Sequence, residues 1–173
     1  MNCSNADVII IRGAPGSGKS QASKCLAAHF PKGVRAEVDS LRAMVISVDW
    51  TNQAEHINML SLAASLVQGF LRLEYRPVIL VDTFSGNKLN KFLAELHSFD
   101  NSLKVRSFAL VTAPEVLRTR LEKRPADKFK DIAICQELNA DIMKHLHPTD
   151  HLIDNTKLTP EQTSAAMLEH LRF

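Results

Sequence analysis

The sequence contains few cysteines and no long apolar stretch, and these two absences exclude several classes of protein. Its three cysteines (Cys3, Cys25 and Cys135) lie far apart and are odd in number, which indicates no disulfide framework or metal site and favours a reducing cytosol. The longest uncharged stretch, residues 57–71, is shorter than the roughly 20 residues of a membrane span. The first residues lack the pattern of a signal peptide. We therefore expect a cytoplasmic protein with no membrane partner.

A strong net charge is also missing. The chain has 21 Lys and Arg against 19 Asp and Glu, a formal net charge of +2. This balance predicts no basic stripe for nucleic acid, so a long nucleic acid is not favoured as a partner. We find no internal repeat or linker, and the length suits one domain with a full core. We expect a single domain over residues 1–173, as a monomer or weak homodimer.

Glycine is scarce as well, and its distribution is informative. Three of the six glycines fall within residues 13–20, which read Gly-Ala-Pro-Gly-Ser-Gly-Lys-Ser. This segment fits the phosphate-loop pattern G-x-x-x-x-G-K-[ST] at every fixed position. Glycines let the backbone curl around an anion and point its N–H groups inward, and a following helix adds its dipole. Lys19 would supply a charge for the outer phosphates, and Ser20 a hydroxyl ligand for Mg²⁺.

The sequence on either side supports this interpretation. Residues 7–12 form an apolar, β-branched run typical of a buried parallel strand, and residues 21–30 have the pattern of a helix. Strand, glycine loop and helix are the context that the motif requires. We expect the phosphates of a nucleotide to bind the following residues: Gly13, Ala14, Pro15, Gly16, Ser17, Gly18, Lys19, Ser20 and Gln21.

Strand and helix patterns alternate along the rest of the chain. Further strands are predicted at residues 34–38, 77–82, 103–111 and 151–154, and helices at 40–47, 52–74, 87–99, 114–123, 131–147 and from 160 onward. Such alternation predicts an α/β fold with a parallel sheet and helices on both faces. Ligands of these folds bind beyond the carboxyl ends of the strands, so residues at those ends become site candidates.

Two acidic residues stand at predicted strand ends. Asp82 follows four apolar strand residues, and we expect it to hold the water shell of the Mg²⁺ bound by Ser20. Asp39 follows the second strand and is the best candidate for a base that accepts a hydroxyl proton. Arg42 shares a helix face with Asp39 and could bind an acceptor phosphate or carboxylate. Alternatively, Asp82 and Asp39 are caps of a strand and a helix, and Arg42 is a solvated surface charge.

A basic segment at residues 118–131 is the third candidate element. It contains Arg118, Arg120, Lys123, Arg124, Lys128 and Lys130. A mobile arginine that closes over a transferring phosphoryl group stabilises charge in the transition state, and any arginine of this segment could take that role. The alternative is ordinary solvation and interaction with the helix dipole.

Two other groups of residues are expected to be structural. His145, His147, Asp150 and His151 could form a metal site, but a helix end with loop residues is favoured. Trp50 and Met59 are expected in the core or in the wall of an apolar pocket, and the uncharged residues 57–71 could line such a pocket.

Several of these segments resemble the small P-loop kinases of the nucleoside-monophosphate-kinase-like group. Residues 12–20 resemble the loop of its polynucleotide 5′-hydroxyl kinase and zeta-toxin branch. Residues 37–42 (Glu-Val-Asp-Ser-Leu-Arg) are similar to that branch's D-x-x-R element, and residues 38–41 equally resemble chloramphenicol phosphotransferases. In both, this Asp activates a hydroxyl. The resemblance therefore implies that Asp39 is the base and that Arg42 binds acceptor or phosphate.

The resemblance extends to the second half of the chain. Residues 120–124 (Arg-Leu-Glu-Lys-Arg) resemble the R-x-x-x-R element of the lid, whose first Arg lies against adenine and whose second reaches the phosphates. Residues 154–161 are similar to the last strand and loop, which runs beside the base, so Arg120 and Asn155 are implied in nucleotide binding. The group implies a three-layer P-loop NTPase fold, a five-stranded parallel sheet in the order 2-3-1-4-5, ATP and Mg²⁺. Within the acceptor-binding segment, residues 39–75, residues 43–75 resemble no particular branch.

The leading hypothesis is an ATP-dependent kinase that phosphorylates a hydroxyl, with Lys19, Asp39 and Arg124 as catalytic residues. A polynucleotide 5′-hydroxyl, an amino sugar, an antibiotic hydroxyl and a nucleoside all remain open as acceptors. A GTPase switch would carry a guanine-reading N-K-x-D, but residues 87–90 read Asn-Lys-Leu-Asn and follow the wrong strand. A nucleotide-binding ATPase or regulatory module without an acceptor is the remaining alternative.

Overall fold

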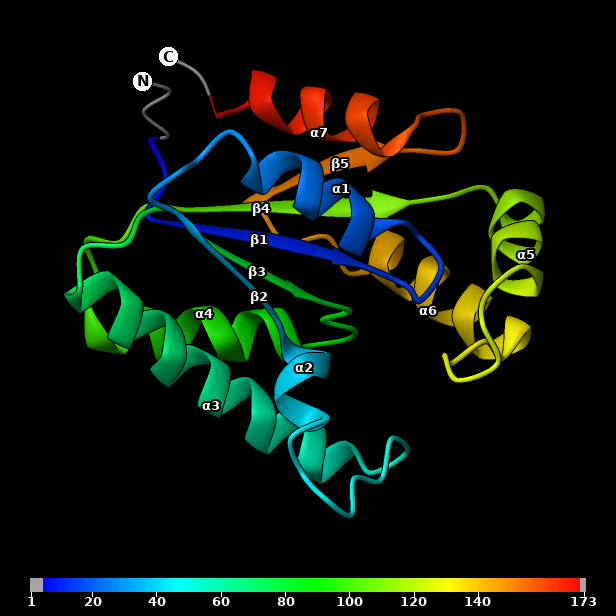
Figure 1. The fold of residues 1–173 in the computed structure, drawn as a ribbon, viewed down its shortest axis with the longest axis horizontal. Helices are drawn as coiled ribbons and strands as arrows, with labels where there is room; N and C mark the ends of the chain where they lie inside the picture. The colour runs from blue at the N-terminus through cyan, green and yellow to red at the C-terminus, as the bar shows by residue number, and fades with distance from the viewer. Residues whose placement is uncertain (1–4, 172–173) are drawn as a thin grey trace.

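A parallel sheet of five strands runs through the centre of the molecule (Figure 1). The structure is a computed structural model, and it describes residues 5–171, so Cys3 lies outside the described residues. The strands are β1 (Val8–Gly13), β2 (Val34–Glu37), β3 (Val78–Asp82), β4 (Val105–Val111) and β5 (Asp150–Asp154). Their order is β2-β3-β1-β4-β5, with parallel pairing at each step. The predicted α/β fold and strand order are confirmed.

Helices cover both faces of this sheet (Figure 1). They are α1 (Lys19–Ala27), α2 (Val38–Arg42), α3 (Gln53–Arg72), α4 (Lys88–Phe99), α5 (Pro114–Glu122), α6 (Ile132–Lys144) and α7 (Pro160–Glu169). Helices α1 and α7 pack on one face, and α3 and α4 pack on the other. Helix α6 also packs on the α3/α4 face, where Ile142 meets Ala109 and Val111 of β4.

Strand β1 is the centre of the core because both of its faces are covered. Val8 and Ile10 pack in the cluster with α3 and α4, whereas Ile9 and Ile11 pack in the cluster with α1 and α7. All four side chains are fully buried. A strand buried on both faces reads as a continuous apolar run rather than an alternating one. This burial fixes the position of the loop that follows β1.

The acceptor-binding segment begins differently from the prediction. Strand β2 ends at Glu37, and Val38 and Asp39 already belong to the first turn of α2. The physical reason is the burial of Val38, which packs beneath α3 in the core. Asp39 is therefore carried by a helix and not by the tip of a strand. The predicted short helix over residues 40–47 ends earlier, at Arg42.

Helix α3 buries Leu60, Ala64 and Val67 against the sheet, whereas Ile57 is 45% exposed. Helix α7 begins with a capping box between Thr159 and Gln162. Over residues 5–171, the structure contains no helix with the length and apolarity of a membrane span.

Candidate active site

The phosphate loop connects β1 to α1 and is shaped by two glycines with left-handed backbone. Gly16 has φ of 86° and Gly18 has φ of 88°, a region that other residues adopt only with strain. A Cβ at Gly16 would lie 2.8 Å from Leu121 Cδ2 of α5, so the loop also packs closely against that helix. Gly18 is the N-cap of α1 and has no side chain. The amides of the first turn are thus left to bind an anion.

Lys19 and Ser20 start α1 at the mouth of this loop. Lys19 Nζ donates to the carbonyl oxygen of Ala14 at 3.3 Å. Burial lowers the pKa of Lys19, while Asp39 and Asp82 act in the opposite direction, so both carboxylates lie close to this ammonium group. Ser20 Oγ donates to Glu37 Oε2 at 3.3 Å.

Glu37 is a site residue that the sequence reasoning missed. It is the last residue of β2 and forms an ion pair with Arg35. The rule that pointed to Asp39, that ligands gather at strand ends, would have found Glu37 once the end of β2 was placed correctly.

The donor atoms of this loop fit a magnesium nucleotide. Serine and carboxylate oxygens are the ligands that Mg²⁺ prefers, and Ser20, Glu37 and Asp82 supply them. The Ser17 hydroxyl is buried and has no hydrogen-bond partner within the described residues. Lys19 has a carbonyl oxygen as its only hydrogen-bond partner in the same part of the chain. Donors held inside a glycine loop in this way suit the oxygens of a phosphate.

Asp82 ends β3 and is buried at 4% exposure. Its carboxylate accepts from His56 Nε2 at 3.1 and 3.2 Å and from the amide of Phe84 at 3.0 Å. Burial alone would raise the pKa of Asp82, but the His56 contact, the Phe84 amide and Lys19 together lower it. Asp82 is thus held as a carboxylate. His56, on α3, is a second residue that no sequence motif indicated.

Asp39, on α2, interacts electrostatically with Asp82 and Lys19. Its side chain is accessible to solvent but has protein around it, and this partial desolvation, followed by repulsion from Asp82, raises the pKa of Asp39. Lys19, Arg42 and His56 act in the opposite direction. The structure therefore brings Asp39, Asp82 and Lys19 together from three separate elements.

Arg42 is not the solvated surface charge of the alternative interpretation. It is only 5% exposed. It donates to the carbonyl oxygen of Asp49 at 3.1 Å and lies 3.9 Å from Glu55 Oε1. Its guanidinium group lies over the ring of Trp50, 4.8 Å from the centroid. Trp50 is itself 46% exposed, so the expectation of a core position is wrong. Its ring forms a cation–π contact with Arg42 at the surface.

On the other side of the loop, Arg120 of α5 joins a polar network with Asn155 and Thr112. Arg120 donates to the Asn155 carbonyl at 3.0 Å and to Thr112 Oγ1 at 3.3 Å. Asn155 Nδ2 donates to the carbonyl of Ser17 at 2.6 Å, so the segment after β5 is bonded to the phosphate loop. Arg120 and Asn155 therefore lie together beside the loop, as their expected role in nucleotide binding requires.

Arg124 lies beyond the end of α5. It donates to the carbonyl of Phe129 at 2.6 Å within the predicted lid. Its charge contributes to the lowered pKa of Lys19, after burial, so its guanidinium lies on the side of the phosphate loop. Residues 118–131 remain a predicted lid.

The cluster of His145, His147, Asp150 and His151 near β5 is held by contacts with the buried Arg12. Asp150 pairs with the buried Arg12 at 2.8 Å and accepts from the amide of His147. Arg12 also donates to the carbonyls of Phe84 at 2.9 Å and His145 at 2.8 Å. Among residues 5–171, no three His, Cys, Asp or Glu side chains are grouped to hold a metal ion.

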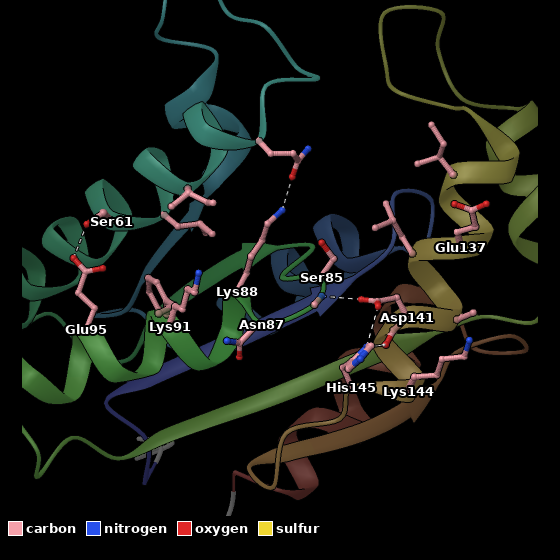
Figure 2. Close-up of a pocket in the computed structure, with 18 residues that line it drawn as sticks. Ser61, Ser85, Asn87, Lys88, Lys91, Glu95, Glu137, Asp141, Lys144 and His145 are labelled. Carbon is pink, nitrogen blue, oxygen red and sulfur yellow. Dashed lines mark hydrogen bonds and ion pairs between the residues drawn. The ribbon is translucent and has the colours of Figure 1, made fainter.

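A cavity of about 970 Å³ lies beside this group of charges. Its walls are α3, the β3–α4 loop, α4 and α6, and side chains from these elements point into it (Figure 2). Ile57 and Leu60 of α3 line it, which explains why Ile57 is exposed and agrees with the expectation that residues 57–71 could line a pocket. Lys88 lines it too and contacts His56, so the cavity adjoins the Asp82 site.

Solved structures that are named as kinases have a fold similar to that of this chain. A sugar kinase from Janibacter sp. HTCC2649 is similar with a TM-score of 0.72 and 19% identity, over 95% of this chain and 93% of the other. A gluconokinase from Sinorhizobium meliloti 1021 has a TM-score of 0.69 and 17% identity, over 98% and 93%. A shikimate kinase from Acinetobacter baumannii has a TM-score of 0.67 and 12% identity, over 96% and 93%. No curated protein matches the sequence.

At these identities the solved structures establish the fold, and they confirm the resemblance to small P-loop kinases of the nucleoside-monophosphate-kinase-like group. A family model described as an AAA domain matches residues 8–149, most of the chain. The chain therefore belongs to the AAA domain family and has the α/β fold of the small P-loop kinases.

Proposed function

We propose that the protein is an ATP-dependent phosphotransferase that moves the γ-phosphate of ATP to a hydroxyl group of a small molecule or a nucleic-acid end. One observation carries the proposal. Lys19 of the phosphate loop after β1, Asp82 at the end of β3 and Asp39 in the first turn of α2, directly after β2, lie at the carboxyl ends of three adjacent parallel strands. A phosphate-binding cation, a metal-binding carboxylate and an accessible carboxylate are the parts that phosphoryl transfer requires.

The chemistry assigns Asp39 to the acceptor. As the acceptor oxygen forms its bond to the γ-phosphorus, the bond to the bridging oxygen breaks and ADP leaves with that electron pair. The hydroxyl proton passes to the carboxylate of Asp39. The raised pKa of Asp39 suits this role, because a base must bind the proton well enough to take it. The solvent access of Asp39 leaves its oxygens free for a hydroxyl.

The other residues hold the donor and its charge. Lys19 and the loop amides bind the phosphates, and Ser20 and Asp82 would hold Mg²⁺, which neutralises phosphate charge when bound. Arg120 and Asn155 border the nucleotide, and Arg124 stabilises the charge of the transition state. Arg42 helps to bind the acceptor from its place beside Asp39.

Small molecules are the first candidate acceptors to assay. Solved neighbours of this chain are named as a sugar kinase, a gluconokinase and a shikimate kinase. The net charge of +2 does not favour a long nucleic acid. Sugars and hydroxy acids are therefore the first acceptors to test, followed by nucleosides and short 5′-hydroxyl oligonucleotides.

The test is Asp39→Asn, measured by ATP binding and by mass spectrometry of the phosphorylated acceptor. We expect unchanged binding and a fall in transfer of roughly 10²- to 10⁴-fold, because the proton loses its acceptor. Asp100→Asn is the matched control, since this aspartate follows α4 and lies near the starts of β1 and β4, away from the phosphate loop, and it should transfer normally. Transfer retained in Asp39→Asn would remove Asp39 as the base. ATP hydrolysis without transfer to any acceptor would favour the nucleotide-binding module.

A further inference from the structure

The partners of Lys88, at the start of α4, are unusual for a lysine. Lys88 Nζ donates to Gln53 Oε1 at 2.8 Å, as Figure 2 shows, and lies 3.1 Å from His56 Nδ1. The side chain is partly buried, and burial lowers the pKa of Lys88 against the attraction of Asp82 and Asp141. None of the ion pairs between residues 5–171 includes Lys88. A desolvated cation with only neutral acceptors is costly until an anion reaches it.

Two of the three carboxylates that line the same cavity are already occupied. Glu95 accepts from Ser61 Oγ at 2.7 Å. Asp141 accepts from the amide of Gly86 at 2.7 Å and pairs with His145 at 2.9 Å (Figure 2). These contacts hold α3 to α4, and α6 to the β3–α4 loop. The third carboxylate, Glu137, is exposed, as are Lys91 and Lys144, so Lys88 is the partly buried lysine of this wall.

The rest of the cavity wall is largely apolar. The apolar side chains come from α3, α4 and α6, and they are Ile57, Leu60, Phe92, Ile134 and Leu138. Such walls favour the carbon skeleton of a small molecule, and a few polar groups fix its orientation. The cavity of about 970 Å³ is large enough for a molecule of this kind.

His56 links this cavity to the reacting groups. It contacts Lys88 through Nδ1 and Asp82 through Nε2. An ammonium group only donates hydrogen bonds, so Nδ1 must accept and the ring proton lies on Nε2. Asp82 and Lys88 therefore lie on two sides of the same imidazole.

We propose that the acceptor carries an anionic group, a carboxylate or a phosphate ester, and that Lys88 binds this group in the cavity between α3, α4 and α6. The hydroxyl to be phosphorylated then points toward Asp39. This inference rests on the proposed kinase function, because it treats the cavity as the acceptor site. Anion binding to Lys88 can nevertheless be measured without turnover, so the two proposals fail separately.

The experiment uses the full chain saturated with Mg²⁺ and a non-hydrolysable ATP analogue, so that the phosphate loop is filled. Inorganic phosphate and malonate are titrated separately at constant ionic strength, and ¹⁵N-histidine NMR follows Nδ1 of His56. We expect a saturable shift with one or both anions and none with glycerol. The anion that binds more tightly identifies the group. If neither anion produces a saturable shift, the proposal is wrong.

Variants of Lys88 and Lys91 test whether Lys88 binds the anion. In Lys88→Gln the affinity should fall at least about tenfold, the value of one charge-assisted hydrogen bond. Lys91→Gln is the matched control, because Lys91 lines the same cavity one turn along α4 and is exposed; we expect a change below about threefold. Lys88→Arg keeps the charge and should keep binding. Unchanged affinity in Lys88→Gln, or equal losses in both glutamine variants, would overturn the assignment.

Discussion

The nucleotide side and the acceptor side of this cleft are held in place in different ways. We call the phosphate loop with Arg120 and Asn155, the proposed nucleotide site, the donor side. There, main-chain atoms shape most of the site, and Asn155 ties the loop to the segment after β5 at 2.6 Å. Buried strands support the loop from below. Its geometry depends on glycine conformations and main-chain hydrogen bonds, which leave little freedom to the chain.

The acceptor side consists of α2, residues 43–52, α3 and the cavity beside them. Here side chains of separate helices determine the surface. Met44 is 74% exposed, Ile46 is 105% exposed and Trp50 is 46% exposed, so the segment that follows α2 has few buried apolar contacts. Segments of this kind open at low free-energy cost and are common at substrate sites. The donor side is thus pre-formed, whereas the acceptor side is able to adjust to its ligand.

The largest effect should follow from Lys19→Ala, which damages the donor side directly. Removing the ammonium group should weaken ATP binding and reduce kcat/KM on the order of 10³-fold, because Lys19 binds charge that grows in the transition state. Isothermal titration with ATP and a coupled ADP assay measure both quantities. On the acceptor side, the variant should leave the NMR response of His56 to anions intact.

Lys24→Ala is the matched control for this prediction. Lys24 lies on the same helix, α1, and is exposed, so its loss should change ATP binding little. If Lys19→Ala turned over normally with ATP, the assignment of the donor side would be wrong.

The next effect concerns Arg12, which joins the two sides. Arg12 is a buried residue of β1 just before the phosphate loop. It donates hydrogen bonds to the carbonyls of Phe84, in the β3–α4 loop, and His145, after α6, and it forms an ion pair with Asp150 of β5. Arg12→Met leaves Asp150 buried without its partner, which typically costs about 3–5 kcal/mol of folding free energy. Urea denaturation of the purified variant measures this loss.

The double variant Arg12→Met with Asp150→Leu separates charge from packing. Replacing both members of a buried ion pair by apolar residues is often neutral, so part of the stability should return. A loss below about 1 kcal/mol in Arg12→Met alone would show that the ion pair does not hold the two sides together.

The same contrast explains what could be predicted from the sequence. The strands and the phosphate loop depend on apolar runs and glycine spacing, which are local patterns, whereas the strand order was implied by the resemblance to the small P-loop kinases. The end of β2 was misplaced by one residue because Val38 is apolar and fits a strand, although tertiary packing places it in α2. Because β2 ends at Glu37 and Val38 begins α2, Asp39 lies on a helix and not at the end of a strand.

His56 and Lys88 show why the acceptor side was beyond sequence patterns. They come from α3 and α4, 32 positions apart, and act together through a contact of 3.1 Å. No spacing rule relates two residues on different helices. Ile57 fitted the apolar period of α3, and only the absence of a neighbouring helix at that turn left it to line the cavity. A cavity arises from the way in which helices pack, and no sequence motif indicates it.

The smallest effect should be a displaced pH profile in Arg42→Gln. Burial and Asp82 raise the pKa of Asp39, and the positive charge of Arg42 opposes them. Without that charge the pKa of Asp39 rises further, so a smaller fraction of the base is deprotonated at a given pH. The acidic limb of kcat/KM should therefore move to higher pH. Arg42→Lys keeps the charge and should hold the limb near its original position. A limb that stays in place in Arg42→Gln, or moves to lower pH, would mean that a group other than Asp39 takes the proton.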